Sequence, residues 1–242
     1  MSEQILSDHR RTWETKPVLR AIYHDFYRRI TAMCRPGETL EIGGGSGILK
    51  NFLPDVISTD VVFMPWLDAV ADAQNLPFRS GRFGNIVGID VLHHIEMPRR
   101  FFFEVERVLA PGGRLILVEP AITPVSWVYY KFLHPEPVEL DANPLMEQEP
   151  DPDRAPFDAN QAIPTLLFGR HRREFAASFP QLRLLSCEKI SLIAYPLSGG
   201  FRRWSLVPER LVDLILKFED SLTPVLGPLM AFRLFITIER IA

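Results

Sequence analysis

The sequence predicts a doubly wound α/β fold with a mostly parallel sheet, and three observations support this prediction. Residues 39–49 read TLEIGGGSGIL, in which a short apolar strand enters a glycine run and apolar residues then restart at helical spacing. Residues 85–91 form an almost unbroken apolar run, which suits a parallel strand buried on both faces. Strand and helix patterns also alternate along the first half of the chain, which is typical of βαβ units.

Periodicity divides the first half of the chain into separate elements. Val18, Ile22 and Phe26 recur at helical spacing near the N-terminus and predict an amphipathic helix. A Pro-Gly-Gly turn at residues 111–113 ends the last helix of this half. The expected helices span residues 16–33, 46–52 and 98–109, and the expected strands span residues 39–42, 56–62, 69–71, 85–91 and 114–118.

The composition changes before strands and helices resume in the second half. Residues 121–164 are rich in proline, aromatic and acidic residues and show no clear periodicity. A segment this long without periodicity is usually functional or disordered, and we expect a lid over a ligand site. Leu211, Leu214 and Phe218 then recur at helical spacing. The expected later elements are a helix over 170–178, a strand over 182–196, a helix over 209–222 and a strand over 231–241.

An apolar segment, LTPVLGPLM, occupies residues 222–230 after the last predicted helix. Together they form an apolar stripe that either packs on the sheet or faces a membrane or a second subunit. We favour packing on the sheet, because residues 206–229 hold too few basic residues for strong attraction to anionic lipid. Peripheral membrane contact stays open, whereas no stretch approaches the ~20 apolar residues that a membrane span requires.

Length and charge restrict the class of protein. The chain has 242 residues, 47% of them apolar, which is enough for one large α/β domain. Its 27 basic and 30 acidic residues give a net charge of −3, so no nucleic-acid partner is expected. Cys34 and Cys187 are the only cysteines, and they offer neither a disulfide framework nor metal-site spacing. Because a signal peptide is also not evident, we expect a cytoplasmic protein, and we predict no metal site.

Acidic residues and glycines follow the ends of the predicted strands. In open α/β sheets, ligands bind outside the carboxyl ends of the strands. Glu41 and the glycine loop 43–47 belong to the end of the first strand, and Asp60 and Asp72 to the ends of the second and third. Ile48 stands where a dinucleotide-binding fingerprint requires its third glycine. The spacing therefore opposes a nicotinamide cofactor, whereas Asp60 could accept both hydroxyls of an adenosine ribose.

The segment from Thr39 to Pro120 resembles the class I S-adenosylmethionine-dependent methyltransferases, and in particular the type 11 methyltransferase domain. The resemblance rests on LEIGGGSG, ISTD, DAQNLPF, DVLHHI, RVLAPGG and LILVEP taken together. It implies S-adenosylmethionine as the cofactor and a seven-stranded sheet whose last strand is inserted antiparallel. Gly44 departs from the family, which often has a larger residue there. The cofactor-binding residues that the resemblance implies are Glu41, Gly43, Gly44, Gly45, Ser46, Gly47, Asp60, Val61, Asp72, Ala73, Asp90 and Val91.

Methyl transfer is an in-line displacement at a sulfonium, so orientation of the acceptor can supply much of the catalysis. An oxygen or nitrogen acceptor often also needs a base within reach, and histidine titrates near neutral pH. His134 and Glu136 adjoin prolines in the predicted lid, which hold the backbone extended. The segment SGGFRR at residues 198–203 could meet an anionic group of the acceptor through its arginines. The candidate catalytic residues are His93, His94, His134 and Glu136, with Glu119 as a further candidate base.

These observations predict methyl transfer to a small-molecule or a lipid- or sugar-linked acceptor by a monomer or homodimer. Two alternatives stay open, namely a nicotinamide-dependent oxidoreductase and a non-catalytic nucleoside-binding or scaffold protein that keeps the fold. The expected organisation is a single methyltransferase domain over residues 1–242, with an N-terminal helical cap over 1–36, a cofactor-binding half over 37–120, a proline-rich lid over 121–164 and a C-terminal half over 165–242.

Overall fold

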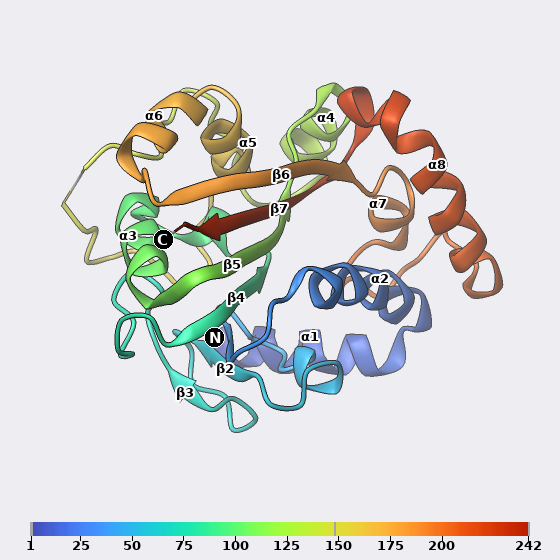
Figure 1. Cartoon of the computed structure of the whole chain (residues 1–242). Coiled ribbons are helices and arrows are strands. Elements are labelled where there is room, and N and C mark those ends of the chain that lie inside the picture. Colours follow the sequence, from blue (N-terminus) through green and yellow to red (C-terminus); the bar gives the residue numbers. More distant parts are fainter. Residues whose placement is uncertain (1, 148, 242) are drawn as a thin grey trace.

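Seven strands form one sheet through the centre of the molecule (Figure 1). The computed structural model describes residues 2–147 and 149–241. The strand order is β3-β2-β1-β4-β5-β7-β6. Neighbouring strands from β3 to β5 pair in parallel, whereas β7 pairs antiparallel with both β5 and β6. This confirms the predicted sheet and its antiparallel last strand. The strands are β1 (Thr39–Glu41), β2 (Ile57–Asp60), β3 (Ala69–Val70), β4 (Phe83–Ile89), β5 (Leu109–Pro120), β6 (Leu182–Ile190) and β7 (Arg233–Arg240).

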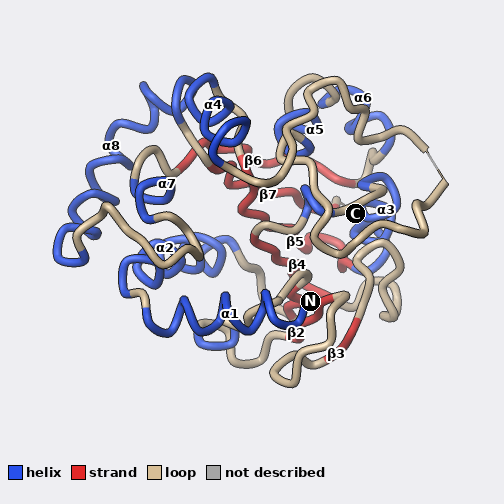
Figure 2. The backbone as a smooth tube through the Cα atoms, turned by 180° about the vertical axis from the view of Figure 1, so that it is seen from behind, coloured by secondary structure: helices blue, strands red, loops and turns tan. Residues whose placement is uncertain are grey.

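Helices cover both faces of this sheet (Figure 2). One face carries α2, α7 and α8, and the other carries α3, α5 and α6. The first α-helix, α1, lies along α2 at the edge near β2 (Figure 1). The helices are α1 (Ser2–Thr15), α2 (Pro17–Met33), α3 (Pro98–Val108), α4 (Pro124–Leu133), α5 (Ile163–Phe168), α6 (Arg172–Ser178), α7 (Ala194–Ser198) and α8 (Val212–Met230), with short 3₁₀ turns η1 (Leu49–Asn51), η2 (Leu92–His94) and η3 (Glu209–Leu211).

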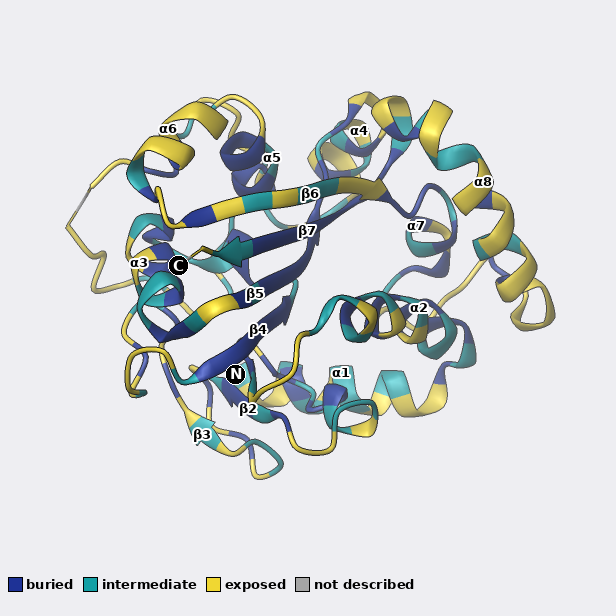
Figure 3. Ribbon diagram, in the orientation of Figure 1, coloured by how far each residue is buried: buried dark blue, intermediate teal, exposed yellow. Residues whose placement is uncertain are grey.

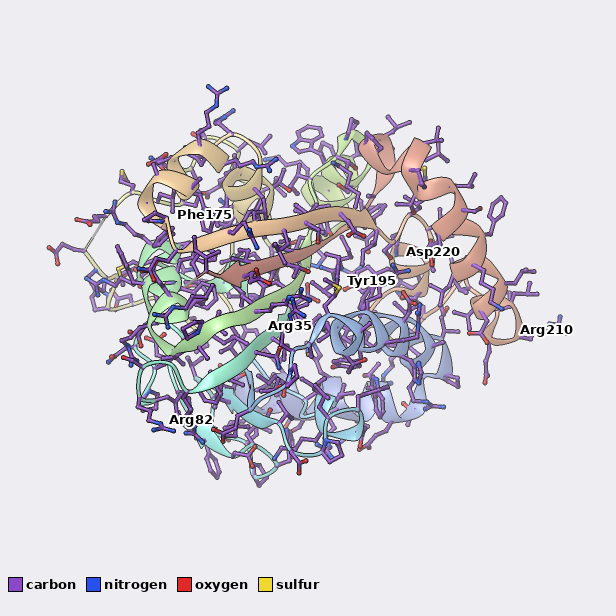
Figure 4. The ribbon with its side chains drawn as sticks, viewed as in Figure 1. Arg35, Arg82, Phe175, Tyr195, Arg210 and Asp220 are labelled. Carbon is purple, nitrogen blue, oxygen red and sulfur yellow. The ribbon has the colours of Figure 1, made fainter. Side chains whose placement is uncertain are left out.

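Each face of the sheet has its own apolar core. On one face, Phe102 of α3 and Phe175 of α6 pack edge to face, with ring centroids 4.8 Å apart, over strand residues such as Leu115. On the other face, Ile22 of α2 packs among residues that include Ile116 of β5. Figure 3 shows the central strands buried, and Figure 4 places Phe175 between α6 and the sheet. The two cores fix the positions of the strand ends and hence of the loops that follow them.

The helix predicted over residues 46–52 is wrong, because only the 3₁₀ turn η1 forms there. Gly45 and Gly47 have φ of +31° and +68°, which a right-handed helix cannot include. Pro54 then disfavours helical backbone at the residue before it. Too few residues remain between these two constraints for an α-helix. The glycine loop is therefore followed by irregular backbone rather than by a helix N-terminus.

The strand predicted over residues 182–196 ends early, at Ile190. Ser191 has a φ of +61°, which turns the chain out of the sheet. The buried carboxylate of Glu219 on α8 then accepts hydrogen bonds from the amides of residues 192–194, at 2.8–3.2 Å. These bonds satisfy amides at the start of α7, so a short helix replaces the end of the predicted strand.

The helix predicted over residues 209–222 continues to Met230 as α8, through Pro224 and Pro228. Both prolines are exposed, so water can reach the carbonyl groups that lose a helical partner. The expectation that this apolar stripe packs on the sheet holds only in part, because α8 contacts β6 and Val212 joins the core on that face, but only three residues of α8 are buried. None of the described helices is long and apolar enough to cross a membrane. The exposed apolar side chains of α8 are Leu214, Phe218, Val225 and Leu229.

No separate helix was predicted for α1, α4, α5 or α7, although α1 lies within the helical cap that was expected over residues 1–36. Leu6 is the one residue of α1 that is buried, so the helix lacks a long apolar stripe. Thr123 and Ser126 form a capping box at the start of α4, inside the segment that was expected to be a lid without periodicity. The segment 121–164 therefore combines a capped helix with a long loop and the beginning of α5.

Candidate functional site

A cavity of about 650 Å³ lies beyond the carboxyl ends of β1, β2 and β4. This is the sheet edge at which ligands of open α/β folds bind. Gly47 does not line it, because the position of its absent Cβ faces Trp66 and Arg10. The predicted site residues that do line it are Glu41, Gly43, Gly44, Gly45, Ser46, Asp60, Val61, Asp72, Ala73, Asp90, Val91, His93, His94, His134 and Glu136.

Bare backbone forms the wall of the cavity after β1. Gly43 and Gly45 have φ of +59° and +31°, in the region that favours glycine. A Cβ on Gly45 would lie 2.9 Å from Cδ2 of Leu6, and one on Gly44 would lie 2.8 Å from Oε2 of Glu41. Side chains therefore do not fit at these positions, and a ligand in the cavity can contact the main chain directly.

Two largely buried carboxyl groups, those of Glu41 and Asp60, lie beside the glycine loop. The hydroxyl of Ser58 donates to Glu41, and burial raises the pKa of Glu41 to about 8. Asp60 accepts hydrogen bonds from the amides of Gly45 (3.0 Å) and Val62 (2.9 Å). Burial raises the pKa of Asp60, although these amides oppose the shift. Asp60 thus fixes the loop, and both acids line the cavity.

The helix α1 lies against the glycine loop from the outer side. Arg10 donates to the carbonyl oxygen of Ser46 (3.0 Å), and its guanidinium lies 4.6 Å from the ring centroid of Trp66. His9 lines the cavity and stacks on Phe201, with ring centroids 4.2 Å apart. The N-terminal helix therefore connects the loop after β1 with the loop after α7.

Two carboxylates flank His93, the second residue of η2. Its Nδ1 lies 2.8 Å from Oε2 of Glu119, and its Nε2 lies 3.5 Å from Oε2 of Glu136. The other oxygen of the fully buried Glu119 accepts from the amides of Val91 (2.9 Å) and Leu92 (2.7 Å). Burial lowers the pKa of His93, but the bonds to both carboxylates outweigh it and raise the pKa to about 9. At neutral pH His93 is therefore protonated, and it lies between the two carboxyl groups.

The lid segment brings Glu136 beside two further histidines. Burial would raise the pKa of Glu136, but the hydrogen bond with His93 and the nearby histidine charges lower it to about 2. Burial and the His93 cation lower the pKa of His94 to about 4, and its Nδ1 lies 3.3 Å from the carbonyl oxygen of Asp158. Burial also lowers the pKa of His134. An ionised carboxylate thus stands among neutral imidazoles and one imidazolium.

His93, His94 and Glu136 each offer one possible metal ligand atom, and these atoms lie within 4.8 Å of one another. Two histidines and one carboxylate form a donor set that suits a transition metal. The structure already gives these groups partners, since Glu136 pairs with His93 and accepts a hydrogen bond from Gln161. The geometry is that of a hydrogen-bonded network, and the expectation of no metal stays a prediction.

Arg233, at the start of β7, is a site residue that the sequence analysis missed. Its guanidinium pairs with both carboxylate oxygens of Asp90, and Nη2 lies 3.2 Å from Oδ2. It also lies 4.0 Å from the ring centroid of Tyr195, which points into the interior (Figure 4). Burial raises the pKa of Asp90, although Arg233 opposes the shift. Asp90, expected only as a cofactor residue, is thus half of a partly buried ion pair at the cavity.

Lys16, between α1 and α2, holds the predicted glycine-arginine loop in place. Its Nζ lies 2.6–2.9 Å from the carbonyl oxygens of Ser198, Gly200, Arg202 and Trp204. Arg202 lines the cavity, but its guanidinium donates to the carbonyl of residue 133 (3.0 Å) at the end of α4. The loop thus reaches the cavity as predicted, while Arg203 does not line it.

Comparison with known proteins bears mainly on the strands and loops around the glycine loop. Residues 40–117 match a family described as a methyltransferase domain. The chain is 35% identical over 52 residues to norajmaline N-methyltransferase of Rauvolfia serpentina, a match that covers 22% of this chain and 18% of that protein. The chain spans less than a fifth of the length of the curated relatives that it matches.

Two solved structures share the fold over most of their length. A putative methyltransferase solved with the Trm112 methyltransferase activator of Haloferax volcanii has a TM-score of 0.53 and 12% identity, over 100% of this chain and 98% of that one. A putative methyltransferase from Bacillus halodurans C-125 has a TM-score of 0.50 and 17% identity, over 90% and 98% of the two chains. At these identities the likeness shows the fold alone.

Proposed function

We propose that this chain is an S-adenosylmethionine-dependent methyltransferase that methylates a small-molecule or a lipid- or sugar-linked acceptor, and the match of residues 40–117 to a methyltransferase domain supports this. One observation carries the proposal. The cavity joins a wall of bare glycine backbone and acids to the ion pair of His93 and Glu136. A cofactor and an acceptor can therefore occupy one continuous space.

The residues of the cofactor end suit S-adenosylmethionine in chemistry and size. A Cβ at Gly43, Gly44 or Gly45 would lie within 3.0 Å of a neighbouring side chain, so the backbone there stays bare, which suits close approach of the methionine part of the cofactor. Asp60 has acceptor oxygens for the ribose hydroxyls, and Asp72 and Ala73 line the wall on which the adenine would lie. When bound, the cofactor supplies a methyl group on a positively charged sulfur. The chain's contribution is to orient that group and to exclude water.

At the acceptor end we assign Glu136 and His94 separate roles. Glu136 is ionised at neutral pH and held by His93, so it can accept a hydrogen bond from an acceptor hydroxyl or amine and orient it. His94 is neutral and can therefore accept a proton. The proton comes from the acceptor hydroxyl or amine, which becomes more acidic once the bond to the methyl group forms. His93 is already protonated and acts by holding Glu136 rather than as a base. His134 lines the same end of the cavity.

The two alternative functions predict different ligands. A nicotinamide-dependent oxidoreductase would bind NAD, which the spacing at Ile48 opposes. A non-catalytic nucleoside-binding protein would bind S-adenosylhomocysteine without releasing methyl groups. Calorimetry with S-adenosylhomocysteine and NAD, combined with a labelled-methyl transfer assay on cell extracts, separates the three. Mass spectrometry of the labelled products identifies the acceptor.

Substitution of Gly45 tests the assignment of the cofactor end. Gly45→Val should abolish binding of S-adenosylhomocysteine, because its side chain would enter the space beside Leu6. Gly112→Val is the matched control, since Gly112 also has a positive φ (+76°) but has no atom within 4 Å of its added Cβ. Asp60→Ala should weaken binding by about 1–3 kcal/mol, the usual loss for a charged hydrogen bond. Retained affinity in Gly45→Val would exclude the glycine loop from the site.

A further inference from the structure

Large apolar side chains gather on three segments at one end of the molecule. Of the twenty exposed large apolar residues among those described, twelve lie on α4, on residues 197–206 and on residues 211–229. Phe132 and Leu206 are each 70% exposed, and Val225 is 77% exposed. We call this surface the apolar face. Its members are Val125, Val128, Phe132, Leu133, Leu197, Trp204, Leu206, Leu211, Leu214, Phe218, Val225 and Leu229.

The three segments of the apolar face adjoin one another. Figures 1 and 2 show α4 beside the end of α8 in opposite views. The guanidinium of Arg202 donates to the carbonyl oxygen of Leu133 (3.0 Å), which joins the loop to α4. The amide of Leu206 donates to the carbonyl of Leu197 (2.8 Å), which folds that loop back on α7. The apolar face is therefore one surface rather than scattered residues.

The charges around the apolar face are mostly basic. Residues 124–133 and 197–206 contain Lys131, Arg202 and Arg203, all exposed, and no acidic residue. Residues 221–230 of α8 carry no charge at all. The exposed acidic residues of this region are Glu209 and Asp213 at the beginning of α8 and Asp220 at its middle, where Arg29 pairs with it. The sequence analysis counted too few basic residues near α8, because these three come from other elements that the fold brings beside it.

We propose that the apolar face docks on a membrane surface that contains anionic lipid. Apolar side chains flanked by basic ones are the pattern by which monotopic proteins enter the lipid interface. A second copy of the chain is the less suitable occupant, because a two-fold contact through this face would bring Lys131, Arg202 and Arg203 toward their own copies. Trp204 adds an aromatic ring of the kind that favours the headgroup region.

Docking on a membrane would restrict the chemical class of the methyl acceptor. This inference about the acceptor rests on the proposed methyl transfer. The segments that form the apolar face also reach the cavity, because Tyr129 and Tyr130 of α4 and residues 199–202 line it. A molecule that leaves the bilayer beside α4 would thus meet His134 and Glu136 after a short path along aromatic side chains. The acceptor class that fits is an amphipathic lipid whose polar end carries the hydroxyl or amine.

The test is vesicle co-sedimentation of the intact chain. Vesicles of phosphatidylcholine mixed with phosphatidylglycerol should bind the protein, and added salt should weaken the binding. Phe132→Ser with Leu206→Ser should lower the vesicle affinity by at least about tenfold. Phe103→Ser on α3 is the control, since Phe103 is also exposed but lies on the opposite side of the sheet. Lys131→Gln with Arg203→Gln should lower the affinity by about 30-fold, against Arg79→Gln with Arg173→Gln as the charge-matched control.

Several results would overturn the proposal. The proposal is wrong if the wild-type protein stays in the supernatant, or if it binds equally well to vesicles of phosphatidylcholine alone. A dimer in sedimentation velocity that Phe132→Ser dissociates would assign the face to a second copy instead. Calorimetry with S-adenosylhomocysteine keeps this test separate from the proposed function. Vesicle binding without binding of S-adenosylhomocysteine would contradict only the methyl-transfer assignment. Binding of S-adenosylhomocysteine without vesicle binding would contradict only the docking proposal.

Discussion

The two ends of the cavity are built by different means. At the glycine end, the loop is held by groups close in sequence, since Asp60 bonds to Gly45 only 15 positions away. At the acceptor end, Asp90 pairs with Arg233 across 143 positions, and Lys16 reaches Ser198 across 182. The glycine end depends on main chain and two acids, whereas the acceptor end depends on a network of buried charges. Local backbone thus shapes one end and tertiary packing the other.

This difference has a consequence for stability. Buried charges that are paired over long distances cost much when one partner is lost, because the other stays buried without compensation. At the glycine loop, by contrast, a substitution acts through steric clashes between the added side chain and its neighbours. Changes at the acceptor end should therefore affect the folding of the whole chain, whereas changes at the glycine end should affect binding.

Loss of Arg233 should have the largest effect. Arg233→Met would leave the partly buried Asp90 without its ion-pair partner and lower the free energy of unfolding by about 3–5 kcal/mol, measured by urea denaturation. Adding Asp90→Asn should restore part of that loss, because the orphaned charge is removed. A change below 1 kcal/mol in the single variant, on the scale of an exposed pair, would show that the two ends do not differ as described.

The pH dependence of stability tests the charge state of His93. Its pKa rises from 6.5 to about 9 on folding, so its contribution is complete below pH 6.5 and is lost as the pH rises through 9. The expected decrease in the free energy of unfolding is about 3 kcal/mol over that range. His93→Gln should remove this decrease, whereas His24→Gln, at an exposed histidine, should keep it. An unchanged profile in His93→Gln would contradict the ion-pair assignment.

Arg10 offers the smallest of the three effects. Arg10→Ala removes the hydrogen bond to Ser46 and the contact with Trp66, and should weaken binding of S-adenosylhomocysteine by about 0.5–1 kcal/mol. Arg11→Ala is the control, because Arg11 is exposed and its guanidinium pairs with Asp8 on the same helix. Equal effects of the two substitutions on the calorimetric affinity would show that α1 does not act on the glycine loop.

The same contrast explains what the sequence could predict. The strand ends and the loop after β1 follow from short patterns, so Glu41, Gly45 and Asp60 could be assigned to one edge of the sheet. The role of Arg233 in the site could not be predicted, because the alternating apolar residues around it indicate a strand and nothing more. The early end of β6 depends on Glu219, which is distant in sequence from the amides that it caps. Such contacts exist only after the chain has packed.

α1 escaped prediction for a different reason. Its contacts are made by Leu6, His9 and Arg10, which lie on one side of a helix but are only partly apolar. A search for apolar periodicity alone does not find such a face. The sequence did contain a pattern that indicates α1, namely polar and aromatic residues spaced three to four positions apart. The apolar stripe of α8, by contrast, was visible, but its exposure depends on what the fold leaves uncovered.

The environment of Lys16 resembles a coordination sphere more than a salt bridge. Four main-chain oxygens surround one ammonium, much as carbonyl groups surround a bound potassium ion. Such a sphere selects for a compact charge with no preferred direction. Arginine carries the same charge but spreads it over a flat fork that cannot meet four converging oxygens. The loop over the cavity is therefore folded around a tethered cation, and its shape depends on the size of that cation as much as on its sign.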